Sequence, residues 1–307
     1  FINASAGASP VIGKRIGQQQ GSTKNSMSTR FYEAFVKKSI PEWKLELRAG
    51  YLNIPFTQDY GKTLFWHEEF NSNQFTHGVG VWHDTGIEAY RNFEAGSVSL
   101  PMYLYFLNGL GGTSSRDNNK DKTILFHAEP EFSGALAGLK TFLSYGFGKW
   151  GDTEWDSDYT AATPAEAMPG EKDQKYNRWS VGTSYDYRKF SVRAETGQYS
   201  RDNYFNFGTT TEADKESSGY YAKLFYKVIP DKLTAMLDYS LLNNDTSATV
   251  SEERKTTILG LQYELAEAMT CIVQFDMADW KNDEEPAATA EDSLKFNRLV
   301  MGIRTTF

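Results

Sequence analysis

The chain has 307 residues, of which 23% are charged, 40% hydrophobic and 15% aromatic, and its net charge is -8. So many aromatic residues predict a folded chain, because disordered chains contain few of them. A single cysteine, Cys271, excludes a disulfide framework. The negative charge argues against nucleic acid as a partner, since phosphate binding requires a basic surface. The longest apolar run, Leu100 to Leu107, is far shorter than the roughly 20 residues of a membrane-spanning helix.

Apolar and polar residues alternate in segments along the whole chain, and this period of two predicts β-strands with two different faces. In one segment, for example, Leu237, Tyr239 and Leu241 alternate with Asp238 and Ser240. About 14 strands are expected, at residues 1–10, 29–38, 44–55, 85–93, 98–108, 122–132, 139–150, 177–187, 190–200, 218–228, 233–242, 255–264, 269–280 and 295–307.

The connections between these strands alternate in length. The short ones are residues 39–43, 94–96, 133–138, 188–189, 229–232 and 265–268, and the long ones are 11–28, 56–84, 109–121, 151–176, 201–217, 243–254 and 281–294. Short periplasmic turns and long external loops are typical of outer-membrane barrels. We therefore predict one domain, residues 1–307, with an all-β fold: a transmembrane antiparallel up-and-down β-barrel. A soluble β-sandwich or lipocalin-like barrel is the alternative, but it gives no reason for the regular alternation.

Four stretches in order carry a resemblance to a known family: Tyr32 to Val36, Leu47 to Phe56, His83 to Ile87 and Tyr105 to Gly109. Together they resemble the phosphate-selective porin O/P family, with the difference that His83 stands where the family usually has arginine. Phe307, preceded by apolar residues at alternate positions, resembles the terminal strand that Gram-negative assembly machinery recognises.

The resemblance implies a porin in the outer membrane of a Gram-negative bacterium, surrounded by lipid and lipopolysaccharide and assembled as a homotrimer. Family members generally have 16 strands, so we expect that two N-terminal strands are missing from this chain. The chain starts at Phe1 without a basic and apolar leader, so we also expect that any signal peptide has been removed.

The long connection 56–84 is the candidate constriction loop. Its aromatic character resembles the loop that folds into the lumen of general porins, and the residues expected to line the constriction are Lys62, His67, Glu68, Glu69 and His77. Alternatively, the aromatic residues fix the loop to the wall while its charges meet water. The histidines also raise the possibility of a zinc site, but they lack the regular spacing of a preformed one.

The alternation also assigns charged residues to the lumen. The basic candidates are Arg48, Lys140, Arg178, Arg193, Lys223, Lys227, Arg298 and Arg304, and the acidic candidates are Glu46, Glu88, Glu129, Glu131, Asp186, Glu195, Asp238, Glu264 and Asp276. His127 falls on the same face as Glu129. A ring of like charge excludes one sign of ion, but this lining is mixed and sums to about -1. Either the charges set a mixed field or they pair across neighbouring strands and keep the lumen wet.

The predicted function is passive diffusion of small hydrophilic solutes or ions, with mixed or weakly cation-favouring selectivity and no cofactor or metal. Phosphate specificity does not follow from the fold alone. Two alternatives remain: a structural barrel that sheathes or anchors a partner such as a multihaem cytochrome or surface-layer protein, and a barrel enzyme. An enzyme is the weaker alternative because His127, the one histidine expected inside a strand, has no serine in phase nearby.

Overall fold

The computed structural model describes residues 6–8, 29–31, 34–58, 75, 79, 83–108, 122–150, 174–205, 212–247, 250–266, 269–284 and 292–305. Its strands are β1 (Ala6–Ala8), β2 (Thr29–Phe31), β3 (Ala34–Ile40), β4 (Leu45–Asn53), β5 (His83–Ala95), β6 (Val98–Leu107), β7 (Thr123–Ala128), β8 (Glu131–Phe132), β9 (Leu139–Trp150), β10 (Gln174–Tyr187), β11 (Phe190–Phe205), β12 (Glu212–Ile229), β13 (Leu233–Ser247), β14 (Val250–Ala266), β15 (Met269–Glu284) and β16 (Asp292–Thr305). Two 3-10 turns, η1 (Pro41–Trp43) and η2 (Gly134–Leu136), lie between strands. Within the described ranges, no helix has the length and apolar character needed to cross a membrane.

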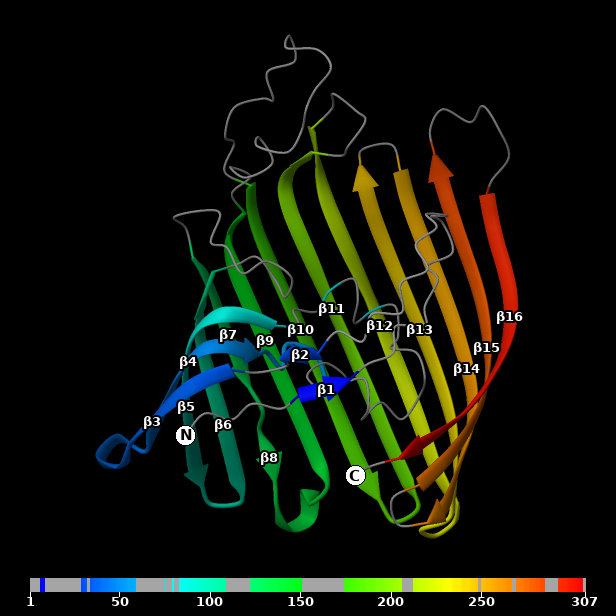
Figure 1. The fold of residues 1–307 in the computed structure, drawn as a ribbon, viewed down its shortest axis with the longest axis horizontal. Coiled ribbons are helices and arrows are strands. Elements are labelled where there is room, and N and C mark those ends of the chain that lie inside the picture. The colour runs from blue at the N-terminus through cyan, green and yellow to red at the C-terminus, as the bar shows by residue number, and fades with distance from the viewer. Residues whose placement is uncertain are drawn as a thin grey trace.

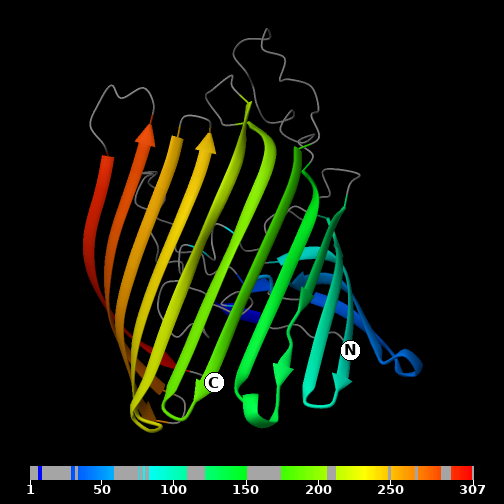
Figure 2. The same cartoon turned by 180° about the vertical axis from the view of Figure 1, so that it is seen from behind.

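The strands from β3 to β16 form one antiparallel sheet of 14 strands in which neighbours in sequence are neighbours in space. Only β8 departs from this path, because it is a short strand that pairs with both β6 and β9. Figures 1 and 2 show the sheet as a curved wall of tilted strands, with β3 and β16 at its two edges. The predicted up-and-down meander of about 14 strands is therefore confirmed.

The make-up of the sheet differs from the prediction at three places. The strand expected at residues 1–10 is described only over Ala6–Ala8, which pairs with Thr29–Phe31 in a separate two-stranded sheet. The strand expected at 29–38 is thereby divided between β2 of that small sheet and β3 of the large one. The strand expected at 122–132 is divided into β7 and β8, with Pro130 between them. Proline has no N–H to donate to a neighbouring strand, which explains the interruption at this point.

The six short connections lie where the sequence predicts them. Gly96 has φ of +60° in the turn between β5 and β6, and Arg188 and Asp231 have φ of +53° and +56° in later turns. Such left-handed residues are what two-residue hairpins with right-handed strand twist require. The turns that follow β5, β8, β10 and β12 gather at the lower end of the wall (Figure 1).

The two faces of the wall have opposite character, and the polar face is the buried one. On one face, Leu237 is 41% exposed and Met301 is 69% exposed, whereas on the other Asp238, Ser240 and Gln274 are at most 1% exposed. A water-soluble protein minimises such apolar exposure, because each Å² of apolar surface in water costs about 25 cal/mol. The pattern is the one a wall acquires when lipid contacts its outer face.

Candidate functional site: the inner face and the segment packed against it

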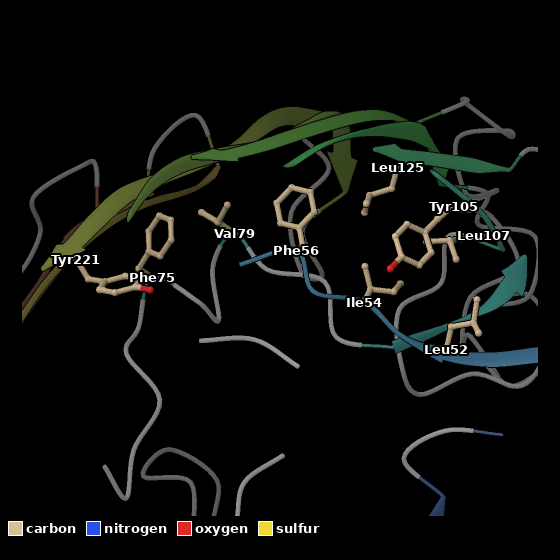
Figure 3. Close-up of a cluster of buried hydrophobic side chains, with 9 residues drawn as sticks. All are labelled: Leu52, Ile54, Phe56, Phe75, Val79, Tyr105, Leu107, Leu125 and Tyr221. Carbon is tan, nitrogen blue, oxygen red and sulfur yellow. The ribbon is translucent and has the colours of Figure 1, made fainter. Parts of the chain in front are cut away.

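A cluster of buried apolar residues lies on the inner face of the wall. It consists of Leu52, Ile54, Phe56, Phe75, Val79, Tyr105, Leu107, Leu125 and Tyr221. Figure 3 shows the wall strands arching over these side chains, with the chain after β4 entering the cluster from below. The side chains of Ile54, Phe56 and Phe75 are 0% exposed. An apolar core therefore fills part of the space that the wall encloses.

The stretch that follows β4, residues 54–58, is called the inner segment below. The Phe56 N–H donates to the Ile54 carbonyl at 2.8 Å, which turns the chain sharply at this point. Ile54 and Phe56 thereby join the apolar side chains Tyr105 and Leu125, which come from β6 and β7. The Phe75 ring packs against the Tyr221 ring of β12, with 5.7 Å between their centroids. Removal of this apolar surface from water holds the inner segment against the wall.

Polar contacts fix the inner segment at two further points. The Ser144 hydroxyl of β9 donates to the Phe56 carbonyl oxygen at 2.6 Å. The Gln58 N–H donates to Glu195 Oε2 of β11 at 2.9 Å, while Ser180 Oγ donates to the other oxygen of the same carboxylate. These contacts give buried backbone groups of the segment the partners they need away from water.

The candidate constriction residues Lys62, His67, Glu68, Glu69 and His77 lie outside the described residues. Within the expected loop 56–84, the structure describes residues 56–58, 75, 79, 83 and 84. His83 begins β5, and its ring stacks on Tyr51 with 5.4 Å between centroids.

The expected lining charges meet across neighbouring strands. Four inner-face ion pairs join residues that face each other directly in the antiparallel register: Arg48 Nε with Glu88 Oε1 at 3.4 Å, Lys140 Nζ with Glu131 Oε1 at 2.6 Å, Lys223 Nζ with Asp238 Oδ2 at 3.5 Å, and Arg298 Nε with Asp276 Oδ2 at 3.0 Å. Of the two interpretations left open by the sequence, these pairs favour local neutralisation of the lining.

The other predicted lining residues also have described surroundings, with one exception. Glu46 pairs with Lys37 at 2.6 Å. The Arg178 guanidinium lies 4.6 Å from the centroid of the Tyr199 ring and 5.8 Å from that of Phe56. Arg193 lies over the Phe225 ring at 5.0 Å. Arg304 is placed by its backbone opposite Thr270, and its side chain lies outside the described part of the structure.

The expectation that no serine approaches His127 is wrong. His127 of β7 faces Ser144 of β9 directly, and the distance from His127 Nδ1 to Ser144 Oγ is 2.7 Å. His127 Nε2 lies 2.9 Å from Glu129 Oε1. Ser144 is 17 positions from His127 in the chain, so alternation within one strand does not bring the two together. Ser144 comes from β9, the next long strand. Because the short strand β8 lies between β7 and β9 in the sequence, the register of β7 with β9 does not follow from the alternation.

Beside Glu129, His127 and Ser144 lies a cavity of about 540 Å³ that the inner segment helps to enclose. Its wall includes Arg48, Glu88, Tyr103, His127, Glu129, Glu131, Lys140, Asp186 and Arg193, together with Thr57 and Gln58 of the inner segment. Tyr103 stacks on Tyr105 with 6.2 Å between ring centroids, and Tyr90 lies 4.8 Å from Tyr103 on the other side. The cavity therefore combines both signs of charge with an aromatic wall.

This arrangement suits the passage or transient binding of small polar solutes. A surface with paired charges and hydroxyl groups can replace part of a solute's water shell. Among the residues that the structure describes, no cluster of three or more His, Cys, Asp or Glu side chains could hold a metal ion.

Comparisons with known proteins give structural neighbours only. The chain matches no protein-family model and no curated protein sequence. Its fold is similar to the outer-membrane channel DcaP of Acinetobacter baumannii, with a TM-score of 0.58 and 14% identity over 94% of this chain and 78% of that one. It is also similar to OmpT of Vibrio cholerae in its trimer form, with a TM-score of 0.57 and 13% identity over 92% of this chain and 83% of that one.

An anion-selective porin from Comamonas acidovorans is a further neighbour, with a TM-score of 0.51 and 12% identity over 91% of this chain and 77% of that one. The chain therefore has the fold of the outer-membrane β-barrel porins, which confirms the predicted fold class. At these identities the likeness concerns the fold, and it does not single out the phosphate-selective porin O/P family.

Proposed function

We propose that this protein is a porin in the outer membrane of a Gram-negative bacterium and that small hydrophilic solutes or ions pass through it by diffusion. One observation carries the proposal: the wall exposes apolar side chains such as Leu259 and Ile303 outward and buries Lys223, Asp238 and Gln274 inward. A polar interior is what a wet channel requires, and an apolar exterior is what lipid requires. The folds of the structural neighbours support the same conclusion.

We further propose that residues 56–84 narrow the channel. This stretch is fixed at the inner face by Phe56 at its start and by Phe75 and Val79 further along, all of which are 0% exposed in the apolar cluster. A loop anchored in this way cannot project wholly outward. In this proposal Lys62, His67, Glu68, Glu69 and His77 lie along the narrowed path and contribute to its electric field.

The selectivity that we propose is mixed or weakly cation-favouring. The lining charges predicted from the sequence sum to about -1, and Glu68 and Glu69 add two acidic groups beside Lys62. Direct cross-strand pairs such as Lys223 with Asp238 weaken any single-sign field at the wall. Phosphate would require a net positive path, so we do not extend the anion preference of the Comamonas acidovorans porin to this chain.

Membership of the phosphate-selective porin O/P family remains a proposal, supported by the four sequence stretches given above. A homotrimer embedded in lipid and lipopolysaccharide is the assembly that we propose. The trimer form of Vibrio cholerae OmpT, a structural neighbour, supports that assembly.

We propose that the protein is not an enzyme. Ser144, His127 and Glu129 have the residue types of a hydrolase triad. However, Ser144 is 0% exposed, and its hydroxyl proton is donated to the Phe56 carbonyl. A nucleophile must reach its substrate, so the row is better suited to holding the inner segment in place. The other alternative, a barrel that sheathes a cytochrome or surface-layer protein, predicts a filled and poorly conducting interior.

Swelling of liposomes that contain the purified protein tests the proposal. Entry of neutral sugars of increasing size should be fast for the smallest sugar and should decline steeply with size, because in this proposal residues 56–84 narrow the path. Liposomes containing heat-unfolded protein provide the control. Folded protein that admits none of the sugars would contradict the proposal and favour the sheath.

A further inference from the structure

Glu129, His127 and Ser144 form a continuous row of hydrogen bonds that ends on the backbone of the inner segment. The distances are 2.9 Å from Glu129 Oε1 to His127 Nε2, 2.7 Å from His127 Nδ1 to Ser144 Oγ, and 2.6 Å from Ser144 Oγ to the Phe56 carbonyl oxygen. His127 and Ser144 are buried, while the Glu129 side chain is 40% exposed. One end of the row therefore reaches the cavity, and the other holds Phe56.

Counting protons along the row fixes the donors. A carbonyl oxygen only accepts, so the Ser144 hydroxyl proton belongs to its bond with Phe56. The contact between His127 Nδ1 and Ser144 Oγ then requires a proton on Nδ1. The contact between His127 Nε2 and Glu129 Oε1 requires a second proton, which is carried either by the nitrogen or by the carboxyl oxygen. In this geometry His127 and Glu129 together hold two protons, one of which they share.

We propose that Ser144 is a positioning residue for the inner segment, and that the proton shared by His127 and Glu129 decides whether its hydroxyl binds the Phe56 carbonyl. When the shared proton leaves to water, neutral His127 retains one proton. That proton is most stable on Nε2, where it is donated to the Glu129 carboxylate in a charge-assisted hydrogen bond. Nδ1 then becomes an acceptor, and the Ser144 hydroxyl turns from Phe56 to His127. The inner segment is thus fastened at low pH and loosened at high pH.

Other charged groups near the row are already engaged with one another. On β4 and β5, Arg48 pairs with Glu88, and on β8 and β9, Glu131 pairs with Lys140. Among the residues that the structure describes, the remaining charged or titratable groups near His127 are Asp186 of β10 and Arg193 of β11, which line the cavity, and the phenols of Tyr90, Tyr103 and Tyr105. Tyrosines ordinarily titrate near pH 10. Within the row, the proton that can leave to water is the one shared by His127 and Glu129, because the Ser144 hydroxyl and the Phe56 carbonyl release none.

The expected change is local because the inner segment has independent anchors. Gln58 remains bonded to Glu195 at 2.9 Å, and Phe56 remains within the apolar cluster. Loss of the Ser144 contact removes one hydrogen bond of the inner segment. The consequence for conductance rests on the proposed constriction by residues 56–84, but the contact itself can be tested without conductance.

The first test measures the access of a reagent to position 57. Thr57 belongs to the inner segment, lines the cavity and is 1% exposed. In a Cys271→Ser background, Thr57→Cys is reacted with a small methanethiosulfonate reagent at about pH 5 and about pH 9, on either side of the ordinary histidine pKa of about 6.5. Thr141→Cys, at a wall position of the same cavity, corrects for the reactivity of the thiol itself. The corrected rate should rise roughly two- to tenfold at high pH, which is the factor for one hydrogen bond.

Variants identify the groups responsible for this change. Ser144→Ala should react at the high rate at both pH values, and His127→Gln should remove the pH dependence. Glu94→Gln changes an exposed acid of β5 that does not line the cavity and should retain the parent response. An equal corrected rate at both pH values in the parent protein would overturn the proposal, even if one of the variants fails to fold.

The second test observes the tautomer directly. In histidine-labelled protein, the 15N signals of His127 are assigned by their absence from His127→Gln. Nδ1 should be protonated at about pH 5 and unprotonated at about pH 9, values that bracket the ordinary histidine pKa. A protonated Nδ1 at both values would contradict the proposal. If this change is found and the protein does not conduct, the porin proposal fails while the assignment of the row stands.

Discussion

Leu237→Arg tests the orientation of the wall. Leu237 is 41% exposed and lies in register between Leu224 of β12 and Leu259 of β14, which are 39% and 47% exposed on the same face. Its position within this apolar band places it in the hydrocarbon region. An arginine at the bilayer midplane of such a barrel costs about 2 to 4 kcal/mol. At 1.36 kcal/mol per factor of ten, the folding equilibrium should shift roughly 30- to 900-fold.

Thr256→Arg provides the matched control. Thr256 is partly exposed on the inner face, opposite Ser240 and three positions along β14 from Leu259, the partner of Leu237. It is a better control than Ser240, which is only 1% exposed and offers an arginine no room. The assay is reversible unfolding by urea in liposomes, followed by tryptophan fluorescence. Thr256→Arg should change the free energy of unfolding much less than Leu237→Arg. Equal losses in the two variants would refute the assignment of the faces.

Three further predictions concern charge and topology. Asp238→Asn removes the carboxylate charge beside buried Lys223, and this change should lower the free energy of unfolding by about 3 to 5 kcal/mol in the same assay. Replacing Lys223 by Met as well should recover most of that loss. No recovery in the double variant would show that the two residues do not act as a pair. A lysine-reactive probe on intact cells should label exposed Lys281 but not Lys232 in the turn after β12, and the opposite result would invert the topology. The double variant Glu68→Gln/Glu69→Gln should move the reversal potential in a KCl gradient toward chloride, and an unchanged potential would remove these residues from the path.

The sequence predicts the strands, their phase and the short turns because each depends on local patterns. Alternating residues such as Leu237 and Asp238 can face lipid and lumen respectively only if the segment forms a strand with two faces. The short turns are predicted because few residues separate the alternating segments on either side. At Arg188 and Lys189, for example, a two-residue hairpin is the simplest connection between the two strands.

Strand ends are predicted less well. The structure extends β12 back to Glu212 and β14 back to Val250, whereas the alternation begins at residues 218 and 255. The added residues are mostly acidic, basic or small polar residues, which are typical of loops. Antiparallel pairing with the neighbouring strands overrides that preference, as in the register of Asp245 with Glu216 and Ser251.

The contacts of the inner face are the part that a sequence pattern alone does not reveal. The bond from Ser144 to the Phe56 carbonyl joins residues 88 positions apart, and the bond from Gln58 to Glu195 joins residues 137 positions apart. Their formation depends on how the chain after β4 enters the wall. Period-two alternation assigns a face to each strand residue but carries no information about which groups on that face meet.

Single-channel recording in a planar bilayer, with the reversal potential measured in a KCl gradient, tests the central claim most directly. A diffusion porin with a mixed lining should give stepwise conductance that rises with salt. Its reversal potential should lie near zero or on the potassium side, and it should approach zero as salt shortens the Debye length from about 10 Å at 0.1 M to about 3 Å at 1 M. Folded protein without conductance steps would contradict the porin proposal, and strong chloride selectivity with block by micromolar phosphate would contradict the proposed selectivity.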